Sequence, residues 1–391
     1  MHCRAAPKKQ FDLAAPACQI VAMDQTRLTL YGLPHSLYTA RVRAYLRKQG
    51  IAYVEVPPTD DRFADVIVPA IGRGIIPVIE MPGGRIIQDS VDIIDHFETA
   101  GAPKWSAYPA DPAVRALAHL FELYAVVGLT RHAMHYRWSY LEHHEAFLTQ
   151  AFAIGGDEAR AQATMGRMQS YLPMLGVNAD TIPAIEQSFH QLLEGLEAHF
   201  ARHPYLLGNQ PSVGDYALFG PLYGHLGRDP VPLAIMQARA PRVFRWTERM
   251  HAPDLDMVEF GDRTGGFAGA GELPDTLGPL LDQIGEEILP DLRDRLAFLR
   301  SYVADGKARP GMPVTAKPHQ RIIGEVETQF RGIPYRGGVQ PYVFFLWQRL
   351  IDAAAFAPEA EAIFTKHGLA GLIECELPIR VERRDHVEVW G

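Results

Sequence analysis

The chain has 391 residues, of which 47% are hydrophobic and 21% are charged, and its formal net charge is -8 at pH 7. This length exceeds what one hydrophobic core usually serves, so we expect two or three domains of about 100–150 residues each. The sequence has no run of five or more basic residues, which argues against a nucleic-acid partner. Its apolar runs, such as 342–347, are far shorter than the roughly 20 residues that span a bilayer.

The N-terminal segment 1–25 is expected to be a disordered extension. Its basic residues precede an apolar stretch that Asp12 and Gln19 interrupt, so the stretch lacks the hydrophobic centre of a secretory signal. Met23 is an alternative natural start of the chain, and the sequence leaves this open.

Short strands and helices alternate between residues 26 and 101. An apolar strand from Leu28 runs into a loop that ends at Ser36, and Gly50 stands where a helix C-terminal cap is expected. The third strand contains Ile76-Pro77, the bond type that adopts cis at modest cost. The pattern predicts strands at 28–31, 52–56 and 74–80, and helices at 38–50 and 91–98.

Helical periodicity dominates residues 107–252, after a linker rich in Pro, Gly and Ala. Asp111 can cap a helix that has Pro112 in its first turn. Ser212 and Asp215 have the spacing of a capping box. We expect helices over 114–135, 171–200 with a break near Asn178 and Pro183, after Ser212, and over 243–250.

The segment 253–391 has a mixed pattern. It begins with a glycine-rich irregular stretch, continues with helical periodicity and then alternates at period two. We expect helices over 280–303, 340–357 and 360–367, and strands over 322–330, 379–382 and 386–390 that pair as a small sheet.

Several of these motifs occur in one order: a strand, the hydroxyl loop ending at Ser36, a helix with Arg41-Val42-Arg43, then Ile76-Pro77-Val78 and Asp89-Ser90. This order resembles the glutathione transferase superfamily, and the capped segment 205–216 is similar to the start of a helix in the second domain of that family.

The resemblance implies an α/β thioredoxin-like N-terminal domain at 26–101 and an all-α glutathione-transferase-type domain at 107–252. It does not cover 253–391. We expect this mixed α+β C-terminal extension to pack on the helical domain and to roof the substrate cleft.

Glutathione must become a thiolate to attack an electrophile, which means lowering a thiol pKa of about 8.5. Ser36 lies five residues before Arg41, the offset that family members with an active-site Ser or Cys show, so it is the first candidate for this role. Tyr31 is the chief rival, and Tyr38 or Thr39 could also reach the thiol. Ser36 could alternatively serve only as a helix cap.

The resemblance also implies how glutathione binds. The backbone of Ile76 would pair with its cysteinyl part, and the helix start at Asp89-Ser90 would meet its γ-glutamyl group. An ordinary edge-strand proline and plain helix capping are the alternatives. The implied glutathione-binding residues are Pro34, Ser36, Ile76, Pro77, Asp89 and Ser90.

The second substrate is expected against the helix that begins near Asp111. Gly128 would leave room there for a planar group. His132 and His135 lack a specified third ligand, so we expect no metal site. We interpret Arg41 and Arg43 as a helix-surface pair that forms ion pairs with carboxylates of the same domain, with a role in holding an anion as the alternative. The candidate cleft residues are Leu33, His35, Tyr124, Gly128, Arg131, His132 and His135.

The resulting hypothesis is a cytoplasmic, homodimeric glutathione transferase that conjugates hydrophobic electrophiles in detoxification, or displaces halide or aryl ether oxygen from them. Three cysteines, Cys3, Cys18 and Cys375, cannot form a disulfide framework, which fits a reducing compartment. Serine at position 36 disfavours thioltransferase chemistry, which needs a cysteine. The alternatives are a glutathione-dependent isomerase of zeta type and a non-catalytic binding protein with this fold.

Overall fold

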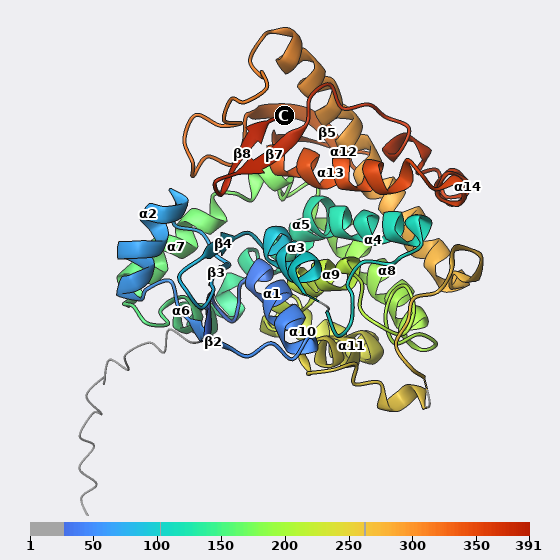
Figure 1. The fold of residues 1–391 in the computed structure, drawn as a ribbon, viewed down its shortest axis with the longest axis horizontal. Coiled ribbons are helices and arrows are strands. Elements are labelled where there is room, and N and C mark those ends of the chain that lie inside the picture. Colours follow the sequence, from blue (N-terminus) through green and yellow to red (C-terminus); the bar gives the residue numbers. More distant parts are fainter. Residues whose placement is uncertain (1–26, 102, 262) are drawn as a thin grey trace, which may run out of the picture.

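A computed structural model describes residues 27–101, 103–261 and 263–391. The expectations for residues 1–25 and Met23 lie outside these ranges. Figure 1 shows a small α/β part, a helical part beside it, and the C-terminal extension lying across both.

The N-terminal part is built on a four-stranded sheet in the order β2-β1-β3-β4, in which β1 is parallel to β2 and antiparallel to β3. Side chains alternate across the sheet as strand geometry requires. Leu30 and Ile79 face the main core, whereas Tyr31 and Val78 pack with Phe63 in a smaller cluster on the other side. The elements are β1 Leu28–Tyr31, α1 Leu37–Lys48, β2 Tyr53–Val56, α2 Val68–Ile71, β3 Val78–Glu80, β4 Ile86–Gln88 and α3 Ser90–Ala100.

A continuous helix forms the centre of the helical part. It consists of α4 (Pro112–Tyr124), a five-residue π-helical stretch (Ala125–Leu129) and α5 (Thr130–Trp138). Among the described helices it is the one long and apolar enough to cross a membrane, but 83% of its most apolar window is buried inside the protein. The burial identifies it as the core helix of this part.

Further helices surround this core helix. Ser212 and Asp215 form the expected capping box at the start of α9, where each side chain binds the other residue's backbone N–H. The sequence pattern did not predict α6, α7 and α10. The bounds are α6 Glu145–Phe152, α7 Glu158–Gln169, α8 Ile182–Phe200, α9 Val213–Gly224, α10 Pro230–Arg239 and α11 Pro241–His251.

The extension holds three of the predicted helices and two separate hairpins. The expected single small sheet is wrong, because β5 pairs with β6 and β7 pairs with β8. Strand β6 escaped prediction because Pro334, Gly337 and Gly338 weaken its alternating pattern. The elements are α12 Gly278–Ala304, β5 Gly324–Phe330, β6 Ile333–Val339, α13 Pro341–Ala354, α14 Pro358–Lys366, β7 Val381–Arg384 and β8 Val387–Trp390.

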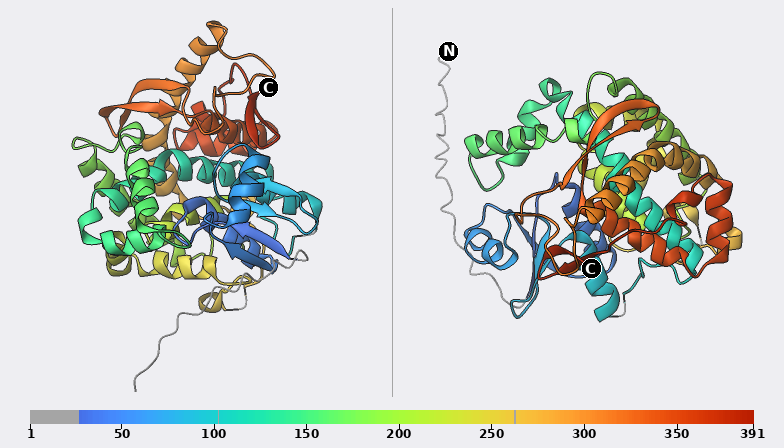
Figure 2. Two further views of the ribbon diagram at one scale, coloured as in Figure 1. Left: turned by 90° about the vertical axis from the view of Figure 1, so that its left-hand side faces the viewer. Right: turned by 90° about the horizontal axis from the view of Figure 1, so that it is seen from above.

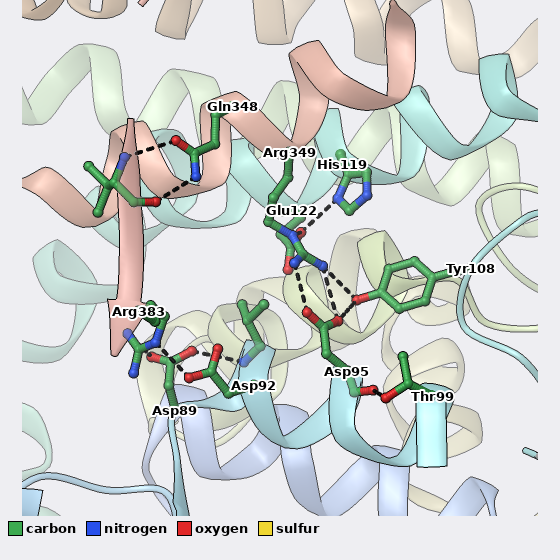
Figure 3. Close-up of polar contacts among 12 residues, drawn as sticks. Asp89, Asp92, Asp95, Thr99, Tyr108, His119, Glu122, Gln348, Arg349 and Arg383 are labelled. Carbon is green, nitrogen blue, oxygen red and sulfur yellow. Dashed lines mark hydrogen bonds and ion pairs between the residues drawn. The ribbon is translucent and has the colours of Figure 1, made fainter. Parts of the chain in front are cut away.

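The extension packs on both preceding parts, as the two further views show (Figure 2). Helix α13 lies along α4. The side chain of Arg349 on α13 contacts Asp95 of α3 at 2.7 Å and Glu122 of α4 at 3.6 Å (Figure 3). The extension therefore covers the junction where α3 of the N-terminal part meets α4 of the helical part.

Candidate functional site

The loop before α1 is held by both of its neighbours. Ser36 is the N-cap of α1, and its Oγ accepts a hydrogen bond from the backbone N–H of Thr39 at 3.3 Å. Arg43 donates to the carbonyl of Leu33 at 3.2 Å, and Arg137 of α5 donates to the carbonyl of His35 at 3.1 Å. Because two guanidinium groups hold the loop carbonyls, Ser36 has a fixed position at the start of the helix.

The support from Arg137 is itself rigid. Its guanidinium makes two hydrogen bonds to the carboxylate of Asp229, at 2.7 and 2.8 Å, and both side chains are buried. Burial and the charge of Arg137 lower the pKa of His35 to about 3, so this imidazole is neutral near pH 7. The helical part thus holds the loop through the guanidinium group of Arg137, and His35 in the loop stays uncharged near pH 7.

A cavity of about 840 Å³ opens beside this loop. Seven residues that the sequence singled out line it: Leu33, His35, Ser36, Tyr38, Ile76, Pro77 and Asp89. The Ile76–Pro77 bond is cis, in agreement with the expectation. Pro34, Ser90 and Tyr31 are not among its lining residues. The structure therefore brings the hydroxyl loop, the cis-proline segment and the start of α3 to one side of one cavity.

The start of α3 has the features of an anion-binding site, and it contains a buried hydroxyl without a hydrogen-bond partner among the described residues. Asp89 has a φ of 87° and caps the helix by accepting the N–H of Val91 at 2.9 Å. Ser90 is fully buried, and its Oγ has no hydrogen-bond partner among the described residues. A buried hydroxyl without a partner costs about 1–3 kcal/mol. Ser90 does not line the cavity, whereas Asp89 does, so the helix N-terminus at Asp89 is the part that fits the γ-glutamyl group of glutathione.

Tyr31 lies elsewhere. It is fully buried in the small cluster with Phe63, and its hydroxyl donates to Glu80 at 3.1 Å. Burial and the charge of Glu80 raise the pKa of Tyr31 well above its ordinary value. Tyr38, by contrast, lines the cavity beside Ser36. Ser36 and Tyr38 therefore line the cavity, whereas Tyr31 does not.

The core helix does line the cavity, but with a different face from the one the sequence suggested. Val126, Thr130 and Met134 contribute at a spacing of four residues, followed by Arg137 and Trp138. The π-helical stretch within the helix changes the phase of its side chains at this point. The predicted residues Tyr124, Gly128, Arg131, His132 and His135 are absent from the lining.

These five residues face other partners. The ring of Tyr124 fills the space beside Gly128 that we had assigned to a planar substrate, since a Cβ at Gly128 would lie 2.3 Å from the ring. The Tyr124 hydroxyl donates to Glu287 of α12 at 2.9 Å, and Arg131 donates to the Tyr335 hydroxyl of β6 at 2.6 Å. This face of the core helix binds the extension.

The two histidines are also engaged in structural contacts. His132 Nε2 lies 2.7 Å from Ser188 Oγ, and His135 Nε2 lies 3.1 Å from Glu186. Burial lowers the pKa of His132 to about 3. Within the ranges that the structure covers, no three His, Cys, Asp or Glu side chains are grouped as metal ligands would be.

Arg41 and Arg43 form ion pairs as expected, but both are buried and not on the helix surface, and Arg41 pairs outside its own domain. Arg43 binds Glu55 of β2, and Arg41 binds Glu122 of the core helix. Burial opposes ionisation of Glu122, but Arg41, His119 and Arg349 together lower its pKa below the ordinary value. These arginines tie elements together and do not line the cavity.

The extension contributes residues that sequence reasoning missed. The Tyr342 hydroxyl donates to Asp89 at 3.0 Å, and Arg383 of β7 lies 3.8 Å from the same carboxylate. Arg383 also binds Asp92 at 2.6 Å (Figure 3). Burial outweighs this ion pair and raises the pKa of Asp92 to about 6. No motif pointed to these residues, because the family resemblance does not cover the extension.

A second group of contacts anchors the terminal hairpin beside the cavity. Arg73, just before the cis-proline segment, binds Gln88 at 2.8 Å and Glu388 of β8 at 3.2 Å. Segments 314–315, 320–322 and 340–342 of the extension, together with Glu388, line the cavity. The cavity therefore has walls from all three parts of the chain.

The fold and site define a protein in which a thioredoxin-like domain, with a serine at the mouth of its first helix, is joined to an all-helical domain. Residues 30–105 match the family model described as "Glutathione S-transferase, N-terminal domain", and residues 179–249 match "Glutathione S-transferase, C-terminal domain". The chain thus carries both domains of the glutathione transferase superfamily. Neither match reaches the extension.

Several solved structures align at low similarity with about three fifths of the chain. The beta-etherase LigF from Sphingobium sp. strain SYK-6 is 18% identical and covers 58% of this chain and 95% of its own, with a TM-score of 0.39. A glutathione S-transferase from Xanthobacter autotrophicus Py2 is 16% identical, with coverages of 59% and 98% and a TM-score of 0.34. No curated protein matches the chain.

Proposed function

We propose that the protein is a glutathione transferase that stabilises the glutathione thiolate for attack on a hydrophobic electrophile, by conjugation or by displacement of halide or aryl ether oxygen. One observation carries the proposal. A single cavity of about 840 Å³ joins Ser36, Ile76-Pro77 and Asp89 on one side to an apolar wall from the core helix on the other.

The proposed binding mode uses the chain's own polar groups. The N-terminal end of α3 would hold the γ-glutamyl carboxylate, and Asp89 would meet the ammonium group. Ile76 would pair with the cysteinyl backbone next to the cis bond. Glutathione supplies the thiol nucleophile when it is bound.

Ser36 would donate its hydroxyl hydrogen to the thiolate sulfur. Its oxygen already accepts the N–H of Thr39, which leaves the hydroxyl hydrogen free to point into the cavity. A hydrogen bond to a charged partner contributes about 1.5–3 kcal/mol. The positive end of the α1 dipole adds to this stabilisation. The apolar wall would exclude water from the attacking sulfur and bind the electrophile.

The cysteine content supports conjugation over disulfide exchange. Within the described part of the chain the cavity has no cysteine, and Cys375 lies in the extension. Burial raises the pKa of the Cys375 thiol to about 11, which makes it a poor nucleophile near pH 7. We assign the protein to the cytoplasm, a reducing compartment, and to detoxification.

Homodimer formation, which the family resemblance implies, is also part of the proposal. Helix α13 covers α4, and Arg349 bridges α3 and α4. A partner subunit would therefore contact the extension or a different face, rather than the bare junction of the two domains. Light scattering measures the oligomeric state directly.

The proposed function is tested by adding reduced glutathione to the protein and recording calorimetry and the ultraviolet difference spectrum of the thiolate. We expect heat of binding and a thiolate signal, and S-methylglutathione should bind without that signal. Binding without thiolate would favour a non-catalytic binding protein. Turnover of a substrate without net consumption of glutathione would favour the zeta-type isomerase. Absence of any binding would refute the proposal.

A further inference from the structure

Helix α7 presents one face to the cavity. Arg160, Thr164 and Arg167 line it at spacings of four and three residues, which places them on one stripe of the helix. Arg160 and Arg167 are two turns apart, about 10 Å along the helix axis. Asp157 is the N-cap of α7 and accepts a hydrogen bond from the backbone N–H of Arg160 at 2.7 Å, so the helix begins just before Arg160.

The positive charge of the cavity is only partly neutralised. Five arginines line it, and two of them are paired, Arg73 with Glu388 and Arg137 with Asp229. The other three have no hydrogen bond or ion pair from their side chains to any residue that the structure describes. These unpaired arginines are Arg160 and Arg167 of α7 and Arg321 of the extension.

The carboxylates of the cavity are, by contrast, already engaged. Glu388 binds Arg73 and Arg383, and Asp89 accepts from Tyr342 and Val91. Asp157 caps α7. These three are the acidic residues of the lining against five arginines, so the cavity keeps a net positive charge. A cleft with an excess of one sign of charge concentrates ligands of the opposite sign.

Apolar side chains lie in the same cavity as these charges. Met134, Trp138 and Phe152 contribute from α5 and α6, and Met168 lies next to Arg167 on α7. The rings of Trp138 and Phe152 lie 6.0 Å apart. This combination suits a molecule with an apolar, planar body and an anionic group, because guanidinium groups bind carboxylates through paired N–H donors.

We propose that the second substrate is an aromatic or similarly apolar acid whose carboxylate or sulfonate is bound by Arg160, Arg167 and Arg321. The inference rests on the proposed function, since it names the substrate class for that cavity. It also gives the extension a role in specificity, because Arg321 is the contribution of that segment to the anion site.

A carboxylate of glutathione itself is the competing source of the anion. Residues Gly155 and Gly156, just before α7, approach Thr59 in the loop after β2. Arg160 therefore lies near the thioredoxin-like domain as well as near the apolar wall. The experiment must separate the two sources.

The test compares dinitrobenzoate with dinitrobenzene, a pair that differs by one carboxylate, and measures binding of each by calorimetry without glutathione. The parent protein should bind dinitrobenzoate about fivefold more tightly, the modest preference that exposed guanidinium groups give. The triple variant Arg160→Gln, Arg167→Gln, Arg321→Gln should lose this preference and still bind dinitrobenzene. Arg239→Gln, which removes an exposed, unpaired arginine of α10 outside the cavity, should keep it.

Glutathione binding by the same variants identifies the source of the anion. If the triple variant loses affinity for glutathione but keeps the preference for dinitrobenzoate, the arginines serve the cofactor and the inference is overturned. Equal affinity of the parent protein for the two arenes would also overturn it. Neither result depends on turnover, so a failure of the proposed catalytic function is seen separately in the thiolate signal.

Discussion

Replacement of Ser36 by alanine should abolish most of the thiolate and leave the fold nearly intact. A hydrogen bond from the Ser36 hydroxyl to the thiolate contributes about 1.5–3 kcal/mol. One pKa unit corresponds to 1.36 kcal/mol, so the pKa of the bound glutathione thiol should rise by about 1–2 units. The hydrogen bond from the Thr39 N–H to Ser36 Oγ, which caps α1, is long at 3.3 Å, so its loss should cost only about 0.5 kcal/mol of stability. We therefore expect kcat/KM to fall about tenfold to a hundredfold with little change in Tm.

The assay is a pH titration of the thiolate difference absorbance in the presence of saturating glutathione, with kcat/KM measured in parallel. Ser36→Thr keeps the hydroxyl and should keep most of the signal. Tyr31→Phe removes a hydroxyl that binds Glu80 outside the cavity and should leave the titration unchanged. An unaltered titration in Ser36→Ala would refute the reasoning, and a shifted titration in Tyr38→Phe would then transfer the role to that neighbour.

Three further predictions concern the extension and a buried amine. Arg349→Leu breaks a partly buried contact with Asp95 and should lower the free energy of unfolding by roughly 2 kcal/mol in urea titrations. Burial lowers the pKa of Lys48 to about 7, so its folded form binds fewer protons than the unfolded chain between that pH and about 10.4. Stability should therefore rise with pH in this window, by up to about 1.4 kcal/mol per unit, and Lys48→Met should reduce the slope. Removal of 253–391 should expose α4 and yield insoluble protein, as a soluble-fraction assay would show.

Each of these predictions has its own control. Arg380→Leu breaks an exposed pair with Asp352 and should cost no more than about 0.5 kcal/mol, so equal losses in the two arginine variants would contradict the argument from burial. Identical pH slopes for the parent protein and Lys48→Met would show that this amine is charged in the folded state. A soluble, truncated protein with unchanged substrate preference would exclude the extension from the cavity.

Local signals were sufficient for the motifs of the two matched domains, though not for helices α6, α7 and α10. Ser36, Ile76-Pro77 and Asp89 occur in short motifs whose backbone requirements can be recognised from the residues themselves, and the structure gathers all of them at one cavity. The capping box at Ser212 is equally local. Such features depend on neighbours within a few residues, so sequence spacing determines them.

Features that depend on distant packing could not be predicted. The core helix was expected, but which of its faces meets the cavity depends on the π-helical stretch and on α12. Tyr342 and Arg383 reach Asp89 from more than 250 residues away, and no periodicity encodes such a contact. Helix α7, with Arg160 and Arg167, carries a weakly amphipathic pattern and was missed altogether.

The cavity has walls from three parts of the chain, so a ligand bound in it contacts all three parts. The stability of the folded protein should therefore depend on that ligand. A ligand present at one hundred times its Kd stabilises the native state by about 2.7 kcal/mol, and this gain is shared by every segment that closes around it. Slower amide exchange in β7–β8 and α7 would accompany saturation with glutathione. Cells depleted of glutathione would then degrade this protein faster, so the abundance of the protein would follow the supply of glutathione.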